Sequence, residues 1–150
     1  MARNCYVLRL GDTEYKLRLT LKGQKNLKAK AKDPNASMLA IIMEALDDPE
    51  TMGNLLTEAL TWEGNKNKVR SGEALYDEMV DADIRGTEAF LPVVLGIAHN
   101  AGLLSEEDRA RVERSTKKML RRGMENLDDF DDDEEGEESP DNPPEEFPTL

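Results

Sequence analysis

The stretch TEAFLPVVLGIAHNAG, residues 87–102, is the most apolar part of the chain and decides how the rest must pack around it. Apolar residues from Phe90 to Ala98 fall on nearly every side of a helix drawn through this stretch. A helix of that kind is stable in water only when other elements enclose it. Gly102 follows where the helix would end, as glycine commonly does. We therefore expect this segment to be the central core helix.

Two β-prone runs near the N-terminus predict a hairpin. From Tyr15 to Leu21 apolar and polar residues alternate, which is the period of a half-buried strand. Residues 5–10 form a second β-prone run, and turn-forming residues 11–14 separate the two. Because a lone hairpin is only marginally stable in water, other elements must cover its apolar face.

Helical spacing or helix-start signals mark five further segments, which are residues 22–32, 38–46, 49–60, 71–81 and 105–127. Asp48 and Ser71 are suitable N-caps, and Pro49 suits the first helical position. The expected fold class is therefore α+β and predominantly α-helical. An N-terminal β-hairpin would pack on a bundle of about five helices.

The acidic excess of the chain lies at its C-terminal end. The net charge is −12, and 12 of the 32 acidic residues occur from Asp128 onward, where there is no Lys or Arg. This end also has four prolines and no apolar periodicity, so burial cannot offset the entropy of ordering it. We expect a folded domain over residues 1–127 and a disordered acidic tail over residues 128–150.

The residue types needed for catalysis or metal binding are scarce. His99 is the only histidine and Cys5 the only cysteine, so neither a multi-histidine zinc site nor a disulfide can form within the chain. We interpret His99 as a helix C-terminal residue and Cys5 as a small buried hydrophobic residue. Glycine-rich phosphate-binding motifs are also missing from the sequence. We expect a protein that is not an enzyme and has no cofactor or metal.

Compartment signals favour a soluble cytosolic protein. A single cysteine fits a reducing compartment. The N-terminus lacks the layout of a signal peptide, and the longest apolar run, residues 90–98, is less than half a membrane span.

Two basic stretches, residues 22–32 and 109–122, raise the alternative of a nucleic-acid-associated regulator. In that alternative the 109–122 helix would bind phosphates and the acidic tail would be autoinhibitory. Neither stretch has interleaved aromatic residues, and the adjoining acidic tail would oppose phosphate binding, so nucleic acid is not the expected partner. A third hypothesis, an inhibitor that mimics DNA, needs a rigid array of charges that a flexible tail lacks.

Three interpretations of the acidic tail remain open. It could keep the protein soluble, because its like charges make copies of the chain repel one another. It could instead fold back on basic residues of the preceding helix, which include Arg111, Arg114 and Lys118. Three apolar residues among the acids, Phe130, Phe147 and Leu150, could also serve as short docking contacts.

The body of the chain resembles the tail assembly chaperones of long-tailed bacteriophages and prophages of Gram-positive hosts. The resemblance covers roughly residues 3–104. It rests on CYVL (5–8), EYKLRL (14–19), LLTEALTW (55–62), GEALYDEMVD (72–81) and the apolar helix that ends in HNAG (99–102).

This resemblance implies a helper protein of the bacterial cytoplasm that is absent from the mature virion. Such a protein would hold the tape measure protein soluble and bring tail tube subunits to it, and self-association is compatible with that role. Helix-in-groove recognition would cover the exposed apolar faces of the tape measure reversibly. The expected contact residues are Leu55, Leu56, Tyr76 and Met79, with Trp62 as an aromatic anchor. Ordinary core packing is the alternative for each of them.

Overall fold

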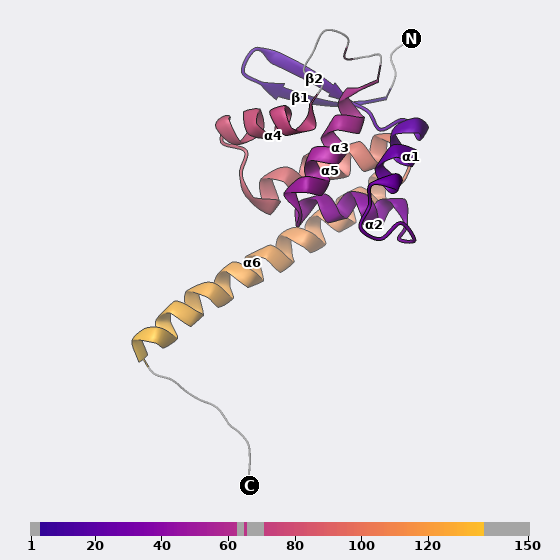
Figure 1. The fold of residues 1–150 in the computed structure, drawn as a ribbon. Coiled ribbons are helices and arrows are strands. Elements are labelled where there is room, and N and C mark those ends of the chain that lie inside the picture. The colour runs from indigo at the N-terminus through magenta and orange to yellow at the C-terminus, as the bar shows by residue number, and fades with distance from the viewer. Residues whose placement is uncertain (1–3, 63–64, 66–70, 137–150) are drawn as a thin grey trace. The chain divides into compact units, whose positions relative to one another are not determined.

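The computed structural model describes residues 4–62, 65 and 71–136, with side chains up to residue 124. An N-terminal hairpin precedes a series of helices (Figure 1), which confirms the α+β, predominantly helical class. The described elements are β1 (Tyr6–Leu10), β2 (Thr13–Leu17), α1 (Leu21–Ala29), α2 (Met38–Met43), the 3-10 helix η1 (Glu44–Leu46), α3 (Pro49–Leu60), α4 (Gly72–Asp81), α5 (Gly86–Asn100) and α6 (Glu106–Gly136).

The hairpin is shorter than the alternating pattern predicted. Strands β1 and β2 are antiparallel, and Leu8 lies opposite Tyr15. Gly11 begins the two-residue turn with a φ of 61°, the sign found at the first position of a type II′ turn. The alternation predicted a strand as far as Leu21, but Leu21 begins α1 and is 67% exposed. The reason is that Thr20 caps α1, its hydroxyl accepting a hydrogen bond from the Gly23 amide at 3.1 Å.

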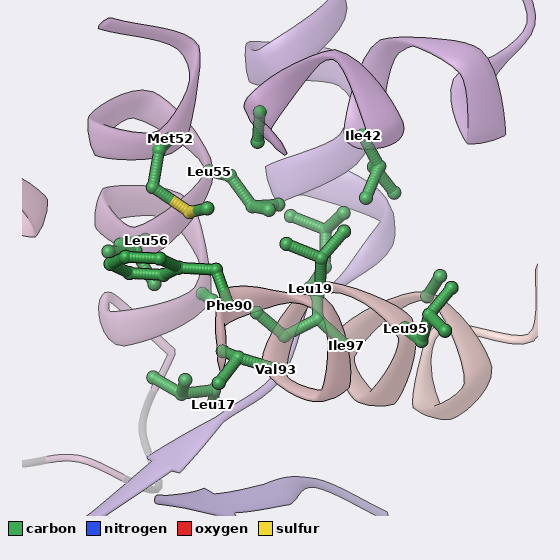
Figure 2. Packing of buried hydrophobic residues seen from close by; sticks show 14 of the residues in the cluster. Leu17, Leu19, Ile42, Met52, Leu55, Leu56, Phe90, Val93, Leu95 and Ile97 are labelled. Atoms are coloured by element: carbon green, nitrogen blue, oxygen red, sulfur yellow. The ribbon is translucent and has the colours of Figure 1, made fainter. Parts of the chain in front are cut away.

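Helix α5 is the centre of the core, as predicted. Phe90, Leu91 and every residue from Val93 to Ala98 are buried. Strand β1, helix α2 and η1 all contact α5, while β2 and α1 contact α3. Figure 2 shows side chains from the hairpin, α2 and α3 converging on α5. The hairpin is therefore covered on its apolar face, which is what its marginal stability requires.

The helix starts follow the local signals in the sequence. Asp48 is the N-cap of α3, with Pro49 in the first turn. The Ser71 hydroxyl caps α4, and the Ser105 hydroxyl accepts from the Asp108 amide at the start of α6. The two serine hydroxyls supply acceptors for amide groups that lack a partner within the helix, whereas the Asp48 side chain makes no such bond.

The chain divides into two compact units, residues 1–113 and residues 114–150. Helix α6 begins in the first unit and continues in the second. The sequence predicted that this helix ends near Leu127, but it continues to Gly136. No glycine or proline interrupts residues 124–135, so the segment contains no helix-breaking residue before Gly136. The described helix thus includes the first nine residues of the predicted tail, whose remainder, residues 137–150, lies outside the described part of the chain.

None of the helices in the described part of the chain is long and apolar enough to cross a membrane.

Tyr15 joins β2 to α4 and makes the stability of the first unit sensitive to alkaline pH. Its hydroxyl donates a hydrogen bond to Glu78 Oε1 at 2.6 Å. Burial, together with this bond to Glu78, raises the pKa of Tyr15 from 10.0 to about 12. Because the native state holds the phenol proton more tightly than the unfolded chain, this contribution is complete below pH 10 and is lost as the pH rises towards 12.

We therefore expect the free energy of unfolding to fall more steeply between pH 10 and 12 in the native chain than in Tyr15→Phe. Urea denaturation at several pH values in that interval measures both slopes. The phenylalanine variant keeps the ring and removes only the titrating group, so lysine titration is common to both proteins. Parallel pH profiles would contradict the expectation.

Candidate functional site

Three of the residues predicted to contact a partner lie in the core instead of on the surface. Leu55 and Leu56 of α3 and Met79 of α4 each have an exposed fraction of 0%. Helix α3 contacts α1, α4, η1 and β2, so other parts of the same unit cover its apolar stripe. The surface role predicted for these three side chains is therefore wrong for this structure, and the alternative of core packing holds.

Tyr76, unlike Leu55, Leu56 and Met79, lines a pocket. It is half-buried on α4 and stacks on Phe90 of α5, with ring centroids 5.4 Å apart and ring planes 14° from parallel. A partly open pocket of about 200 Å³ lies beside this pair. We call it the Tyr76 pocket, and it is lined by Ala45, Leu46, Asp47, Asp48, Pro49, Met52, Tyr76, Gly86, Thr87 and Phe90.

Local backbone geometry brings these elements together. The Ala82 and Asp83 amides donate to carbonyls of the last turn of α4, and the Ile84 amide donates to Met79 O at 2.9 Å. Asp83 and Gly86 have positive φ angles of 69° and 85°, which reverse the chain between α4 and α5. This tight connection places the start of α5 beside Tyr76, and the turn from η1 into α3 contributes the opposite rim.

Two carboxylates lie on the rim of the Tyr76 pocket, and Lys32 pairs with one of them. The Thr51 hydroxyl donates to Asp48 Oδ2 at 2.6 Å, and Lys32 Nζ lies 3.1 Å from the same oxygen. These two contacts, with Thr51 first, hold the pKa of Asp48 below its usual 3.8. Asp48 is thus a carboxylate at neutral pH, and Asp47 lies next to it on the rim.

The size and lining of the Tyr76 pocket favour an apolar side chain over a small-molecule cofactor. Its volume of about 200 Å³ is below the range of roughly 300–1,000 Å³ that is common for ligand pockets. Apolar contacts come from Leu46, Met52 and Phe90, whereas the charged groups are confined to Asp47 and Asp48. A large aliphatic or aromatic side chain flanked by a cation matches this arrangement of an apolar floor and an anionic rim.

Trp62, the predicted aromatic anchor, is held by the hairpin. Its indole Nε1 donates to the Lys16 carbonyl at 2.8 Å, and the Arg18 guanidinium lies over the ring at 5.7 Å from the centroid. Asn65 also bonds to the backbone of Lys16. The indole therefore ties the chain after α3 to the end of β2, and this intramolecular contact accounts for its position.

Trp62 also lines a second, more polar pocket of about 350 Å³ between α1 and the end of α3. Its floor holds Glu58, which is 8% exposed. Asn26 Nδ2 donates to Glu58 Oε1 at 3.1 Å, and Lys30 Nζ lies 3.5 Å from Oε2. Both carboxylate oxygens thus have partners within the protein, so this pocket is explained by the attachment of α1 to α3.

The predicted basic contacts lie on α6. Arg114 and Lys118 are exposed, and Arg111 forms an ion pair with Asp108 at 3.0 Å. Arg109 likewise binds Glu106. Carboxylates of the same helix therefore neutralise the first basic residues, which weakens the case for a phosphate-binding face.

The three predicted docking residues of the tail are not tested by side-chain geometry. Phe130 falls within α6, where only the backbone is described, and Phe147 and Leu150 lie outside the described residues.

The two residues considered for chemistry have ordinary surroundings. His99 Nδ1 lies 2.8 Å from the Leu104 carbonyl, and Nε2 lies 3.6 Å from Glu106 Oε1. Its place in the last turn of α5 is the one predicted. Cys5 is half-buried, somewhat more open than predicted, and carries a free thiol. Among the side chains that the structure describes, no group of three or more His, Cys, Asp or Glu is arranged to hold a metal ion.

Comparison with known proteins identifies no relative of this chain. No family model, curated protein or solved structure matches the chain.

Sequence patterns predict Tyr76 as a partner contact but do not predict the other residues that line its pocket. They place Met52 and Phe90 in the core and give Asp48 only a role in helix capping. Tyr76 and Phe90 belong to different helices, and the stacking depends on the turn at Asp83 and Gly86. The one signal that could have indicated this turn is Gly86, the first residue of α5.

Proposed function

We propose that the chain is a non-catalytic phage tail assembly chaperone. It would bind the tape measure protein through the Tyr76 pocket and bring tail tube subunits to it. It would act in the cytoplasm of the bacterial host and stay out of the mature virion. The observation that supports a binding role is the Tyr76 pocket itself, in which stacked aromatic rings and aliphatic groups form an open apolar floor with two carboxylates at the rim.

The pocket suits the chemistry of an unassembled tape measure helix. Such a helix exposes apolar side chains until the tail tube encloses it, and soluble proteins rarely leave large apolar patches uncovered. One apolar side chain of the helix would enter between Tyr76 and Met52. A neighbouring lysine or arginine would pair with Asp47, because Asp48 is already paired with Lys32. This pair would fix the orientation and speed the encounter.

The decisive experiment is co-expression with a tape measure protein and a tail tube protein encoded beside it. The proposal requires that the chain raise the soluble fraction of the tape measure and be recovered with it in a pull-down. If no complex forms and the soluble fraction of the tape measure does not rise, the assignment is wrong.

Filling the Tyr76 pocket is expected to weaken tape measure binding at least about tenfold, because contacts at an interface centre are worth roughly 2 kcal/mol or more. Thr87→Trp does this from the first turn of α5, where Thr87 is half-buried on the pocket wall. Titration calorimetry with a soluble tape measure fragment gives the dissociation constant.

Ala89→Trp is the matched control, since Ala89 lies on the same helix, is exposed and does not line the pocket. It is expected to leave the affinity within about twofold, as surface contacts outside an interface contribute little. Equal losses in Thr87→Trp and Ala89→Trp would place the binding site elsewhere.

A further inference from the structure

Helix α6 separates its charges into two blocks. A basic block over residues 109–122 contains seven Arg or Lys residues. An acidic block over residues 125–135 contains eight Asp or Glu residues and no Lys or Arg. Gly123 lies between the blocks, and a Cβ atom added there would meet nothing within 4 Å.

Exposed apolar side chains lie where the two blocks meet. Met119 is 67% exposed and Met124 is 65% exposed, which makes them two of the most exposed large apolar residues among the described side chains. Leu120, beside Met119, is half-buried. Leu120 and Met124 are four residues apart and share one face of α6, whereas Met119 lies on another face. An apolar pair flanked by charges of opposite sign is typical of a helix that pairs with another helix.

The charge order is unfavourable for a helix on its own. Acids at a helix C-terminus oppose the partial negative charge of the helix dipole. Within the acidic block like charges also recur three and four residues apart, as at Asp128, Asp131 and Asp132, and such pairs repel. A cationic surface along this half of α6 would remove both penalties.

We propose that this surface is the basic block of a second copy of the chain, paired antiparallel to the first along residues 114–136. In this arrangement each basic block faces an acidic block, and Met124 of each copy lies close to the two-fold axis. A parallel pair would put like charges opposite each other, so the charge order selects the antiparallel orientation. This inference is independent of the proposed tail assembly function.

The basic block cannot pair with the acidic block of its own chain while α6 is intact. Residues 114–136 form one continuous helix, and a straight helix cannot lay its second half on its first. Pairing within one chain would need a break near Gly123, so a second copy satisfies both blocks with the helix unchanged.

A charge-swap experiment tests the pairing. The first variant carries Arg114→Glu, Lys118→Glu and Arg121→Glu, and the second carries Glu125→Lys, Asp128→Lys and Asp132→Lys. Sedimentation equilibrium of the full chain in 50 mM NaCl should give a dimer for the native protein and a monomer for each variant alone. An equimolar mixture of the two variants should restore a dimer that contains one copy of each.

In each variant the dimer dissociation constant should rise at least about tenfold. Two-fold symmetry doubles the number of ion pairs reversed, and one exposed pair changes the dissociation constant by up to roughly fivefold. Raising NaCl to 500 mM should weaken the native dimer, since screening acts on exposed charges. Circular dichroism of each variant checks that the helices persist.

Reversal of three exposed lysines of α1, in Lys22→Glu, Lys25→Glu and Lys28→Glu, is the control for total charge and should leave the dimer intact. A native chain that is monomeric at about 100 μM would overturn the proposal. So would a mixture of folded variants that fails to associate, or a dimer that only the α1 reversals disrupt.

Discussion

Replacing Gly72 with alanine is expected to lower the free energy of unfolding by about 3 kcal/mol, because α4 and α3 meet there with no room for a methyl group. A Cβ atom at Gly72 would collide with the Gly53 carbonyl oxygen and the Thr57 amide nitrogen, both backbone atoms of α3. It would also lie 2.6 Å from Thr57 Oγ1, which accepts the Gly72 amide hydrogen bond at 2.8 Å. Backbone cannot move aside as a side chain can, so the whole of α4 would have to shift.

The matched control is Gly53→Ala, on the opposite side of the same helix contact. There a Cβ atom would come no closer than 3.5 Å to the Glu73 side chain, which is ordinary contact. Gly53 lies inside α3, where alanine is a better helix former by about 1 kcal/mol, so this variant should be as stable as the native chain or more so. Urea denaturation followed by circular dichroism compares the two, and equal stabilities would contradict the close approach at Gly72.

The same contact positions the Tyr76 pocket. Tyr76 lies one helical turn after Gly72, so a displaced α4 would move its ring relative to Phe90. Gly72→Ala should therefore weaken the proposed partner binding as well as the fold. Thr87→Trp, which fills the pocket without touching the contact between α3 and α4, separates the two effects.

Local signals in the sequence are enough to predict the elements of the fold. Ser71 and Asp48 mark two helix starts because short polar side chains suit the N-cap. Both occupy that position in the structure, and the Ser71 side chain makes the capping hydrogen bond. The uninterrupted apolar run from Phe90 identifies the central helix, since only enclosure makes such a helix stable. The strand predicted at Leu21 is wrong because alternation continues past the strand, while the cap at Thr20 determines where α1 begins.

The candidate site is harder to predict because an amphipathic stripe does not say what covers it. Leu55 and Leu56 have the spacing of a docking face and equally that of a core face. The difference depends on contacts with α4, η1 and β2, which lie in other parts of the sequence. The Tyr76 pocket depends likewise on the turn between α4 and α5, so no periodic pattern encodes it.

Leu56→Ala is expected to cost about 3 kcal/mol of unfolding free energy, and this loss distinguishes a core residue from a docking residue. Leu56 is completely buried, and Figure 2 shows it on α3 among the buried hydrophobic residues of the core. Its removal would leave a cavity that the surrounding helices can only partly close. If Leu56 were a surface contact, the same change would reduce partner binding and leave stability within about 0.5 kcal/mol.

Leu21→Ala supplies the comparison, since it removes the same atoms from a side chain that is 67% exposed. Its unfolding free energy should stay within about 0.5 kcal/mol of the native value, because the leucine is already largely in water. Thermal and urea unfolding of both variants give the two differences under one set of conditions. A stable Leu56→Ala would mean that α3 is not enclosed, and its apolar stripe would return as the surface for a tape measure helix. A destabilised variant would mean that the apolar stripe of α3 belongs to the core, and the proposed partner binding would then need another surface such as the Tyr76 pocket.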